Sequence, residues 1–169
     1  MGTRAAARLV RVLVLCASLS QAAIADEDRD RLADFPVSQL SIATPDARIH
    51  RLTVWVAATP AHRAQGLMWI RDLPDDTGML FLYGRPQPVS MWMKNTLIPL
   101  DMLFIRADGR VVRVVEDTEP LSLATIAAGE DVTGVLELEA GEAARLGLRP
   151  GVIVQHPAFG TAEPGANRR

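Results

Sequence analysis

The sequence predicts a mainly β domain, a compact antiparallel β-sandwich or barrel with two short helices. Three observations support this fold class. Short apolar runs recur with the period-two alternation of half-buried strands, most clearly over Arg48–Ala57. Asp108-Gly109, a dipeptide typical of tight hairpin turns, lies between two such runs. Strands do not alternate with long helices, so a doubly wound α/β fold is not expected.

Both predicted helices have recognisable ends. Thr59 is a suitable N-cap for a helix that starts at Pro60 and ends near Met68, since its hydroxyl can accept a hydrogen bond from the first turn. The second helix, Gly141–Leu146, is followed by Gly147, which suits a left-handed C-cap. We therefore expect one helix after the second strand and one near the end of the domain.

Eight strands are predicted along the chain. Pro86 and Pro88 are expected to interrupt the sheet after the third strand, because proline has no N–H to donate to a neighbouring strand. In chain order, the predicted strands are Gln39–Ala43, Arg48–Ala57, Gly78–Tyr83, Val89–Asn95, Leu100–Arg106, Arg110–Glu116, Thr133–Glu139 and Val152–His156.

The first 25 residues have the features of a secretory signal peptide. Arg4, Arg8 and Arg11 precede a short apolar core at Val12–Leu19, and an A-x-A cleavage signal occupies positions 23–25. The apolar core is shorter than the roughly 20 residues that a membrane-spanning helix needs. An uncleaved anchoring helix is the alternative, and we expect cleavage before Asp26.

These features divide the chain into four predicted segments. We expect a signal peptide at 1–25, a charged flexible leader at 26–37, the β domain at 38–158 and a flexible tail at 159–169. The leader is dominated by acidic residues and arginine, and the tail contains Gly, Pro and Asn without a periodic apolar pattern.

Cleavage of the signal peptide limits the chemistry of the mature chain. Cys16 is the only cysteine, so its removal leaves no disulfide, thiolate nucleophile or cysteine metal site. Three arginines and no acidic residue are lost, and the formal charge changes from −2 to −5. Such a charge disfavours non-specific nucleic-acid binding. We expect an exported or secreted protein, in a bacterium a periplasmic one, with no nucleic-acid partner and no stable membrane anchor after cleavage.

The stretch Met91–Asp101 is chemically the richest part of the chain. Its eleven residues, MWMKNTLIPLD, include a tryptophan, two methionines, an amide, a hydroxyl and a carboxylate. Lys94 is the only lysine in the sequence, and every other basic side chain except histidine is arginine. Lysine differs from arginine in that its pKa falls readily on burial, so its single use here is a candidate functional signal.

Strand alternation predicts how these polar side chains are arranged. If the region is a strand, Trp92, Lys94 and Thr96 share one face and Asn95 lies on the other. Asp101 begins the next strand, so we expect it near Lys94 at one end of a hairpin. This arrangement predicts either a small-ligand site or a structural salt bridge between Lys94 and Asp101.

Several segments resemble, in sequence and order, a domain family of unknown function, the DUF192 family (also called UPF0127). The most specific segment is Trp92-Met93-Lys94-Asn95-Thr96 followed by Ile98-Pro99-Leu100-Asp101. The resemblance implies a small, jelly-roll-like β domain and no established reaction. Thr118–Asp131 departs from the pattern of the family. The other matching segments are Val54–Ala57 with Thr59, Arg63 with Gly66-Leu67-Met68, Gly78-Met79-Leu80-Phe81, Asp108-Gly109, and Leu136-Glu137-Leu138 with Gly141.

Two more charged residues complete the candidate site. Arg63 can clamp a carboxylate or phosphate with two hydrogen bonds, or tie its helix to a neighbouring carboxylate. Glu137 lies between two leucines on a predicted strand, so its side chain faces away from theirs and can pair with Arg63 or Lys94. The candidate ligand-binding residues are Arg63, Trp92, Lys94, Asn95, Thr96, Asp101 and Glu137.

Three functions are compatible with these residues. The first is a non-enzymatic domain that binds a small ligand or an envelope partner through the Lys/Asn/Asp cluster. The second is a hydrolase or transferase that uses Lys94 with Asp101 or Glu137. The third is a structural or assembly protein. No cofactor is expected, and the three histidines are too scattered to predict a metal site.

Overall fold

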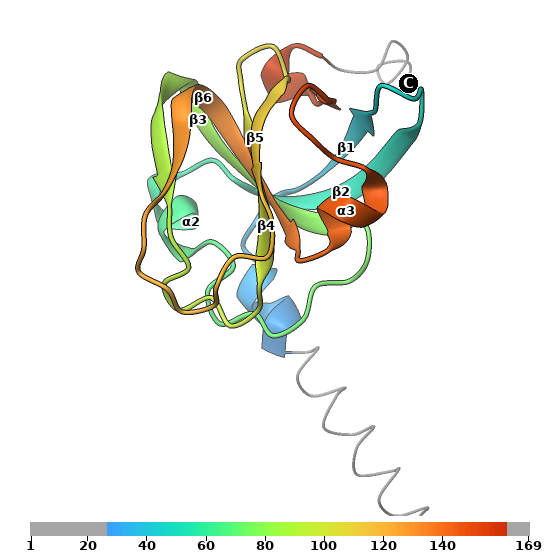
Figure 1. The fold of residues 1–169 in the computed structure, drawn as a ribbon. Coiled ribbons are helices and arrows are strands. Elements are labelled where there is room, and N and C mark those ends of the chain that lie inside the picture. The colour runs from blue at the N-terminus through green and yellow to red at the C-terminus, as the bar shows by residue number, and fades with distance from the viewer. Residues whose placement is uncertain (1–26, 162–169) are drawn as a thin grey trace, which may run out of the picture. The chain divides into compact units, whose positions relative to one another are not determined.

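The computed structural model describes residues 27–161, which fall into two compact units that divide between Asp34 and Phe35. All seven strands belong to the second unit (Figure 1). In the first unit, residues 27–32 are helical, within the segment that the sequence predicts to be a flexible leader. The predicted signal peptide, and the tail from residue 162 onward, lie outside the described residues.

The second unit is one curled seven-stranded sheet that forms a half-barrel, which confirms the predicted mainly β class. The strand order is β5-β4-β6-β3-β2-β1-β7. Neighbouring strands are antiparallel except β2 and β3, which are parallel and are connected through a short helix. The strands are β1 (Val37–Ala43), β2 (Ile49–Ala57), β3 (Thr77–Met91), β4 (Leu100–Ile105), β5 (Val111–Val115), β6 (Ile126–Glu139) and β7 (Ile153–Gln155).

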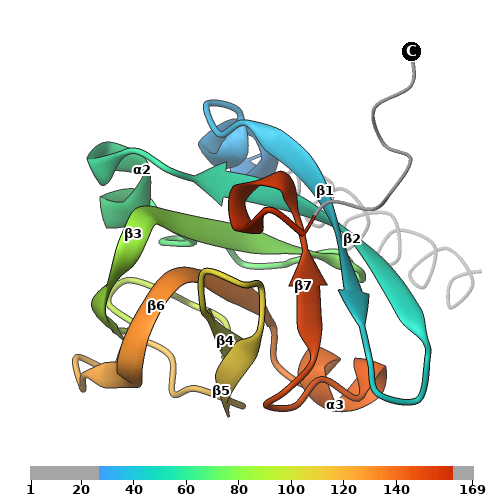
Figure 2. The same ribbon diagram turned by 90° about the horizontal axis from the view of Figure 1, so that it is seen from above.

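The two edges of the curled sheet meet at one end. Figure 2 shows β7 between β1 and the β4–β5 hairpin. The backbone of Arg110 bridges Ile153, and the amide of Val154 donates to the carbonyl of Gly109 at 2.8 Å. Gly109 has φ 77°, as expected for the Asp108-Gly109 turn. These bonds occupy backbone groups that an open sheet edge would expose.

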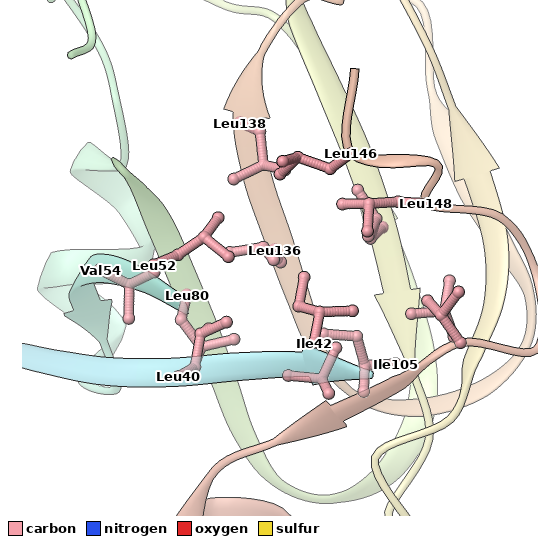
Figure 3. Close-up of a cluster of buried hydrophobic side chains, with 14 of the residues drawn as sticks. Leu40, Ile42, Leu52, Val54, Leu80, Ile105, Leu136, Leu138, Leu146 and Leu148 are labelled. Atoms are coloured by element: carbon pink, nitrogen blue, oxygen red, sulfur yellow. The ribbon is translucent and has the colours of Figure 1, made fainter. Parts of the chain in front are cut away.

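Buried aliphatic side chains fill the inside of the half-barrel (Figure 3). Leu136 and Leu138 point from β6 into this cluster, where they meet side chains from β1, β2, β3 and β4. Because strand side chains alternate, Glu137 points to the opposite face, as the sequence predicts. The labelled members in Figure 3 are Leu40, Ile42, Leu52, Val54, Leu80, Ile105, Leu136, Leu138, Leu146 and Leu148.

Three short helices accompany the sheet: α2 (Pro60–Gln65), α3 (Glu142–Leu146) and a 3₁₀ turn, η1 (Pro157–Phe159). Thr59 caps α2 as predicted, and its hydroxyl accepts from the amide of His62 at 3.1 Å. Gly147 ends α3 in the left-handed conformation, also as predicted. Phe159 is buried against the aliphatic cluster, so packing of the domain continues at least to this residue.

Two predictions about the middle of the chain are wrong. β3 runs through Pro86 and Pro88 to Met91. The β3–β6 ladder is irregular beside both prolines, with register shifts between Leu82 and Gln87 and between Pro88 and Ser90. The predicted strand Val89–Asn95 therefore ends at Met91, and Lys94 and Asn95 form a turn. Asn95 has φ 57°, a left-handed conformation that asparagine tolerates better than most residues and that a strand excludes.

Candidate functional site

A cavity of about 110 Å³ lies beside Glu137, on the face of the sheet opposite the aliphatic cluster. Its walls come from α2 and the residues after it, from β3, from the turn after β3 and from β6, elements that lie together in Figure 1. Five of the seven residues that the sequence nominates line this cavity: Arg63, Trp92, Lys94, Thr96 and Glu137. Asn95 and Asp101 do not line it.

Glu137 is the most unusual group in the cavity wall. Its side chain is only 4% exposed, and no hydrogen bond or ion pair reaches its carboxyl group from another residue of the described chain. Burial alone raises the pKa of Glu137 to about 8, because the charged form loses its hydration. The carboxyl group is therefore mostly neutral at pH 7, and the predicted pairing with Arg63 or Lys94 is not formed.

Two glycines allow close packing near the cavity, Gly78 between β3 and β6 and Gly66 in the cavity wall itself. A Cβ atom on Gly78 of β3 would overlap the carbonyl oxygen of Glu137 on β6, so only glycine permits this strand spacing. Gly66 ends α2 with φ 50°, and a Cβ there would lie 3.1 Å from the ring of Phe81. Both glycines belong to the segments that carry the family resemblance, and their positions explain that part of the pattern.

Arg63 joins the helix to the sheet through backbone carbonyls. Its Nη1 donates to the carbonyl oxygen of Ala58 and, at 2.9 Å, to that of Leu82. Its guanidinium also lies 5.3 Å from the ring centroid of Tyr83. Arg63 thus anchors its helix as the sequence allows, but its partners are backbone carbonyls rather than a carboxylate. Arg63 also lines the cavity.

Tyr83 couples electrostatically to both charged neighbours. Burial, followed by the negative charge of ionised Glu137, raises the pKa of Tyr83 to about 12, and the charge of Arg63 partly opposes this rise. The hydroxyl of Tyr83 donates toward Sδ of Met91 at 3.4 Å. Tyr83 is therefore a neutral, uncharged wall of the cavity at physiological pH.

Lys94 lies over the ring of Trp92, with its Nζ 5.2 Å from the ring centroid. Trp92 is 51% exposed, so this cation–π pair forms part of the open side of the cavity. No ion pair between Lys94 and Asp101 occurs within residues 27–161. The predicted salt bridge is wrong because the two residues do not flank a tight hairpin.

Asp101 instead holds three backbone amides inside the half-barrel. Its Oδ2 accepts from the amides of Gly141 and Ala143, and its Oδ1 accepts from the amide of Asp117, each at 2.9 Å. Gly141 is the N-cap of α3 and has no side chain, so the fully buried carboxylate of Asp101 caps this helix from β4. Asp101 is therefore structural, and it lies on the face of the sheet opposite Glu137.

Two loops contact the turn that carries Lys94. The amide of Trp69 donates to the carbonyl of Asn95 at 2.9 Å, and the amide of Leu121 donates to that of Thr96 at 3.1 Å. Trp69 and Leu121 have positive φ, which is unusual for such large residues, and Asn95 has positive φ as well. Asn95 also donates from Nδ2 toward Sδ of Met68 at 3.6 Å. Asn95 thus fixes the turn through its backbone and side chain, and it does not line the cavity.

Sequence reasoning missed part of the cavity wall. Tyr83, Met68 and Met91 border the cavity but were not nominated. The alternation of Met79, Phe81 and Tyr83 along β3 is the signal that could have found Tyr83. It becomes informative only once Met79 is known to pair with Glu137 across the sheet.

No group of three or more His, Cys, Asp or Glu side chains in the described chain is arranged to hold a metal ion. No helix between residues 27 and 161 is long and apolar enough to cross a bilayer.

The fold and the cavity define a small, mainly β domain with a polar cavity on one face of its sheet. The family model DUF192, described as "Uncharacterized ACR", matches residues 41–156. The match covers more than half of the chain and confirms the resemblance, so the chain belongs to the DUF192 family.

Two crystal structures are similar to this chain over most of its length. One, from Sinorhizobium meliloti 1021, is described as a "putative transcription regulator". It is 44% identical, covers 73% of this chain and 96% of its own, and superposes with a TM-score of 0.72. The other is a protein of unknown function from Novosphingobium aromaticivorans DSM 12444. It is 34% identical, covers 71% of this chain and 85% of its own, and has a TM-score of 0.68. No curated protein matches the chain.

Proposed function

We propose that this DUF192 domain binds a small polar molecule in the cavity beside Glu137, without catalysing a reaction. The observation that supports the proposal is a buried carboxyl group with no partner in a cavity wall. The carboxyl group opens onto the cavity but is largely removed from bulk water, which costs free energy unless a hydrogen bond replaces the lost hydration. A bound molecule that forms a hydrogen bond with the Glu137 carboxyl group would offset this free-energy cost. A folded protein can retain such a locally destabilising group when the group serves binding.

The size of the cavity limits the ligand. A cavity of about 150 Å³ holds a molecule as large as benzene, so a cavity of about 110 Å³ holds a molecule of about that size or smaller. Its open side, at Trp92 and Lys94, leaves room for a longer ligand to extend into solvent. We therefore propose a small metabolite or the end group of a larger molecule.

A fragment screen by NMR chemical-shift perturbation tests this proposal. The same library is applied to the wild type, to Glu137→Gln and to Glu139→Gln, a matched control two residues further along β6 that does not line the cavity. We expect fragments that shift the resonances of Tyr83 and Trp92, with an altered profile only in Glu137→Gln. A folded wild type that binds no fragment would overturn the proposal and favour the structural or assembly role.

Export is part of the proposal and rests on the sequence of residues 1–25. In a bacterial host we expect the mature chain in the periplasm, beginning at Asp26. Mass spectrometry of the N-terminus after cell fractionation tests this. An intact N-terminus on a cytoplasmic protein would contradict it.

The enzymatic alternative has one supporting observation. A carboxyl group whose pKa is about 8 can donate or accept a proton near neutral pH, and Lys94 borders the same cavity. Asp101 is removed from this hypothesis because its carboxylate already accepts three amides. Hydrolysis of nitrophenyl esters between pH 6 and 9 tests the remaining form. Equal rates for wild type and Glu137→Gln would exclude it.

An envelope partner is a further alternative. Trp69, Trp92, Leu121 and Leu123 are 45–67% exposed, and they lie on the loops around the Lys94 turn or directly beside them. Photo-cross-linking from position 123 in intact cells tests this, and the absence of any cross-link there and at position 69 would remove it. The regulator description of the Sinorhizobium protein is not extended to this chain, whose net charge of −2 gives nucleic acid no electrostatic attraction.

A further inference from the structure

We propose that the cavity selects small monocarboxylates and binds them while Glu137 is protonated, so that each binding event at high pH takes up one proton. This inference rests on the proposed ligand site and names its ligand class. It depends on three features of the cavity: the sign of its charged groups, the protein cations that already lie beside its aromatic rings, and the protonation state of Glu137.

The charged groups that border the cavity favour an anion. Arg63 from α2 and Lys94 from the turn after β3 are both cationic. Glu137 from β6 and Tyr83 from β3 are the other titratable groups in the wall. On β4, the strand on the other side of β6, the residue paired with Glu137 is the uncharged Met102. When Glu137 is neutral, the cavity therefore presents two positive charges and no negative one.

The aromatic walls do not form a cage for a cation. The rings of Tyr83 and Trp92 each already have a protein cation nearby, Arg63 at 5.3 Å and Lys94 at 5.2 Å from the respective ring centroids. A quaternary ammonium ligand would have to approach these rings against two like charges. The same rings, together with Phe81, offer apolar surface to the body of a ligand whose charged end is negative.

Glu137 supplies the hydrogen bond that distinguishes the two protonation states. Its protonated carboxyl has an O–H donor and finds no acceptor among the described residues. A ligand carboxylate can accept this bond, which would be short and charge-assisted. An ionised Glu137 would instead repel the ligand. Its pKa of about 8 makes the neutral form dominant at pH 7, and a bound anion would raise this pKa further.

A monocarboxylate fits this wall better than a phosphate does. A carboxylate has one polar end that can meet Glu137 and the cations, and a short aliphatic chain can rest against Phe81 and Tyr83. Phosphate is polar on every side and would leave oxygens against these rings without partners. The volume of the cavity favours a chain of acetate to butyrate length.

Calorimetric titration of the purified protein tests the inference, with butyrate as the probe and butylammonium, tetramethylammonium and inorganic phosphate as comparisons. We expect butyrate to bind most tightly, with about tenfold weaker binding per pH unit once the pH exceeds the pKa of Glu137. In buffers of different ionisation enthalpy, uptake of close to one proton per butyrate is expected at pH 9. Glu137→Gln, which keeps a donor, should bind butyrate with no such pH dependence, while Glu139→Gln should behave as the wild type.

The outcomes separate this inference from the proposed function. If an ammonium probe binds better than butyrate, or if butyrate affinity is unchanged from pH 6 to 10, the cavity binds ligands but the proton-linked anion class is wrong. Preferential binding of phosphate likewise overturns the carboxylate assignment. If no probe of either charge binds and the fragment screen is also blank, the proposed function itself fails.

Discussion

Asp101 and Glu137 are two buried carboxyl groups on neighbouring strands, with opposite surroundings. Asp101 is paired in register with Leu138, and Glu137 with Met102, so the two acids lie one position apart across β4 and β6. Asp101 points into the half-barrel and accepts three backbone amides. Glu137 points to the other face and has no partner among the described residues. The comparison teaches that burial alone does not mark a functional acid. The lack of hydrogen-bond donors is what distinguishes Glu137 as the candidate site residue.

The largest expected effect comes from removing the structural acid. Asp101→Ala leaves the amides of Asp117, Gly141 and Ala143 without an acceptor and removes the cap of α3. Hydrogen bonds to a charged group contribute about 1.5–3 kcal/mol each and are not additive, so we expect a loss of about 4 kcal/mol of unfolding free energy. Urea denaturation measures this. Asp101→Asn, which keeps one acceptor oxygen, should lose less, and an equal loss would contradict the capping account.

Glu137→Gln is expected to act in the opposite direction. The folded pKa of about 8 lies above the ordinary value of 4.5, so the neutral acid is favoured by folding. Its contribution to stability is complete below pH 4.5 and is lost as the pH rises toward 8. At pH 8.5 the variant should therefore be more stable than the wild type by about 2–3 kcal/mol, after allowing for a buried amide.

Denaturation at pH 4.5 and pH 8.5 checks the sign of this effect. We expect the gain from Glu137→Gln to be confined to the higher pH. Partial burial and the charges of Asp72, Asp75 and Glu142 also raise the pKa of Glu139, so Glu139→Gln should show a gain of the same sign but smaller size at pH 8.5. A gain of equal size at both pH values would mean that burial of the charge is not its cause. No gain at all would mean that Glu137 has a partner in solution.

His156 should give a smaller effect at acid pH. Its Nδ1 accepts from the amide of Ala158 at 3.2 Å, so its proton is on Nε2, which lies 3.0 Å from Oγ of Ser38. Burial lowers the pKa of His156. The stability that its neutral form provides is therefore present above pH 6.5 and is lost as the pH falls through the folded pKa. A cap bond of this kind is worth about 1 kcal/mol.

Comparison of the wild type with His156→Asn across pH 5–7.5 measures this contribution. Asparagine can accept a bond from the same amide but does not titrate in this range. We expect the stability of the wild type to fall toward pH 5 more steeply than that of the variant. Parallel curves would show that His156 does not sense pH in the folded protein.

Lys94→Ala is expected to have the smallest effect on stability. Lys94 is exposed, and its contact with Trp92 is worth about 0.5–1 kcal/mol. The melting temperature should change little, while the affinity for butyrate should fall several-fold because one of two cations is lost. A large loss of melting temperature with unchanged affinity would assign Lys94 to the fold rather than to the site.

The sequence predicts the fold better than it predicts the site, and particular residues show why. The alternation of β2, the Asp108-Gly109 turn and the caps at Thr59 and Gly147 are local signals, and each is confirmed. The parallel pairing of β2 with β3 has no local signal, because it depends on where β3 returns after α2. Local preference is overridden where tertiary contacts supply a bulge or a turn.

The candidate site is likewise predicted only where local strand alternation determines it. Glu137 could be assigned to the face away from Leu136 by alternation alone, and the structure agrees. Closeness in sequence predicts that Asp101 lies beside Lys94, but strand pairing brings Asp101 to the amides of Gly141 and Ala143 instead. Strand pairing in the folded sheet decides which buried acid receives hydrogen bonds from backbone amides. This pairing cannot be predicted from local patterns in one sequence.

Direct titration of the Glu137 side-chain carboxyl by ¹³C NMR, with and without butyrate, tests the central claim most directly. The account predicts a pKa of about 8 in the free protein and a higher value when butyrate is bound. A pKa near 4.5 in the free protein, or one that butyrate leaves unchanged, would contradict the claim that Glu137 is an unpartnered acid held for a small carboxylate.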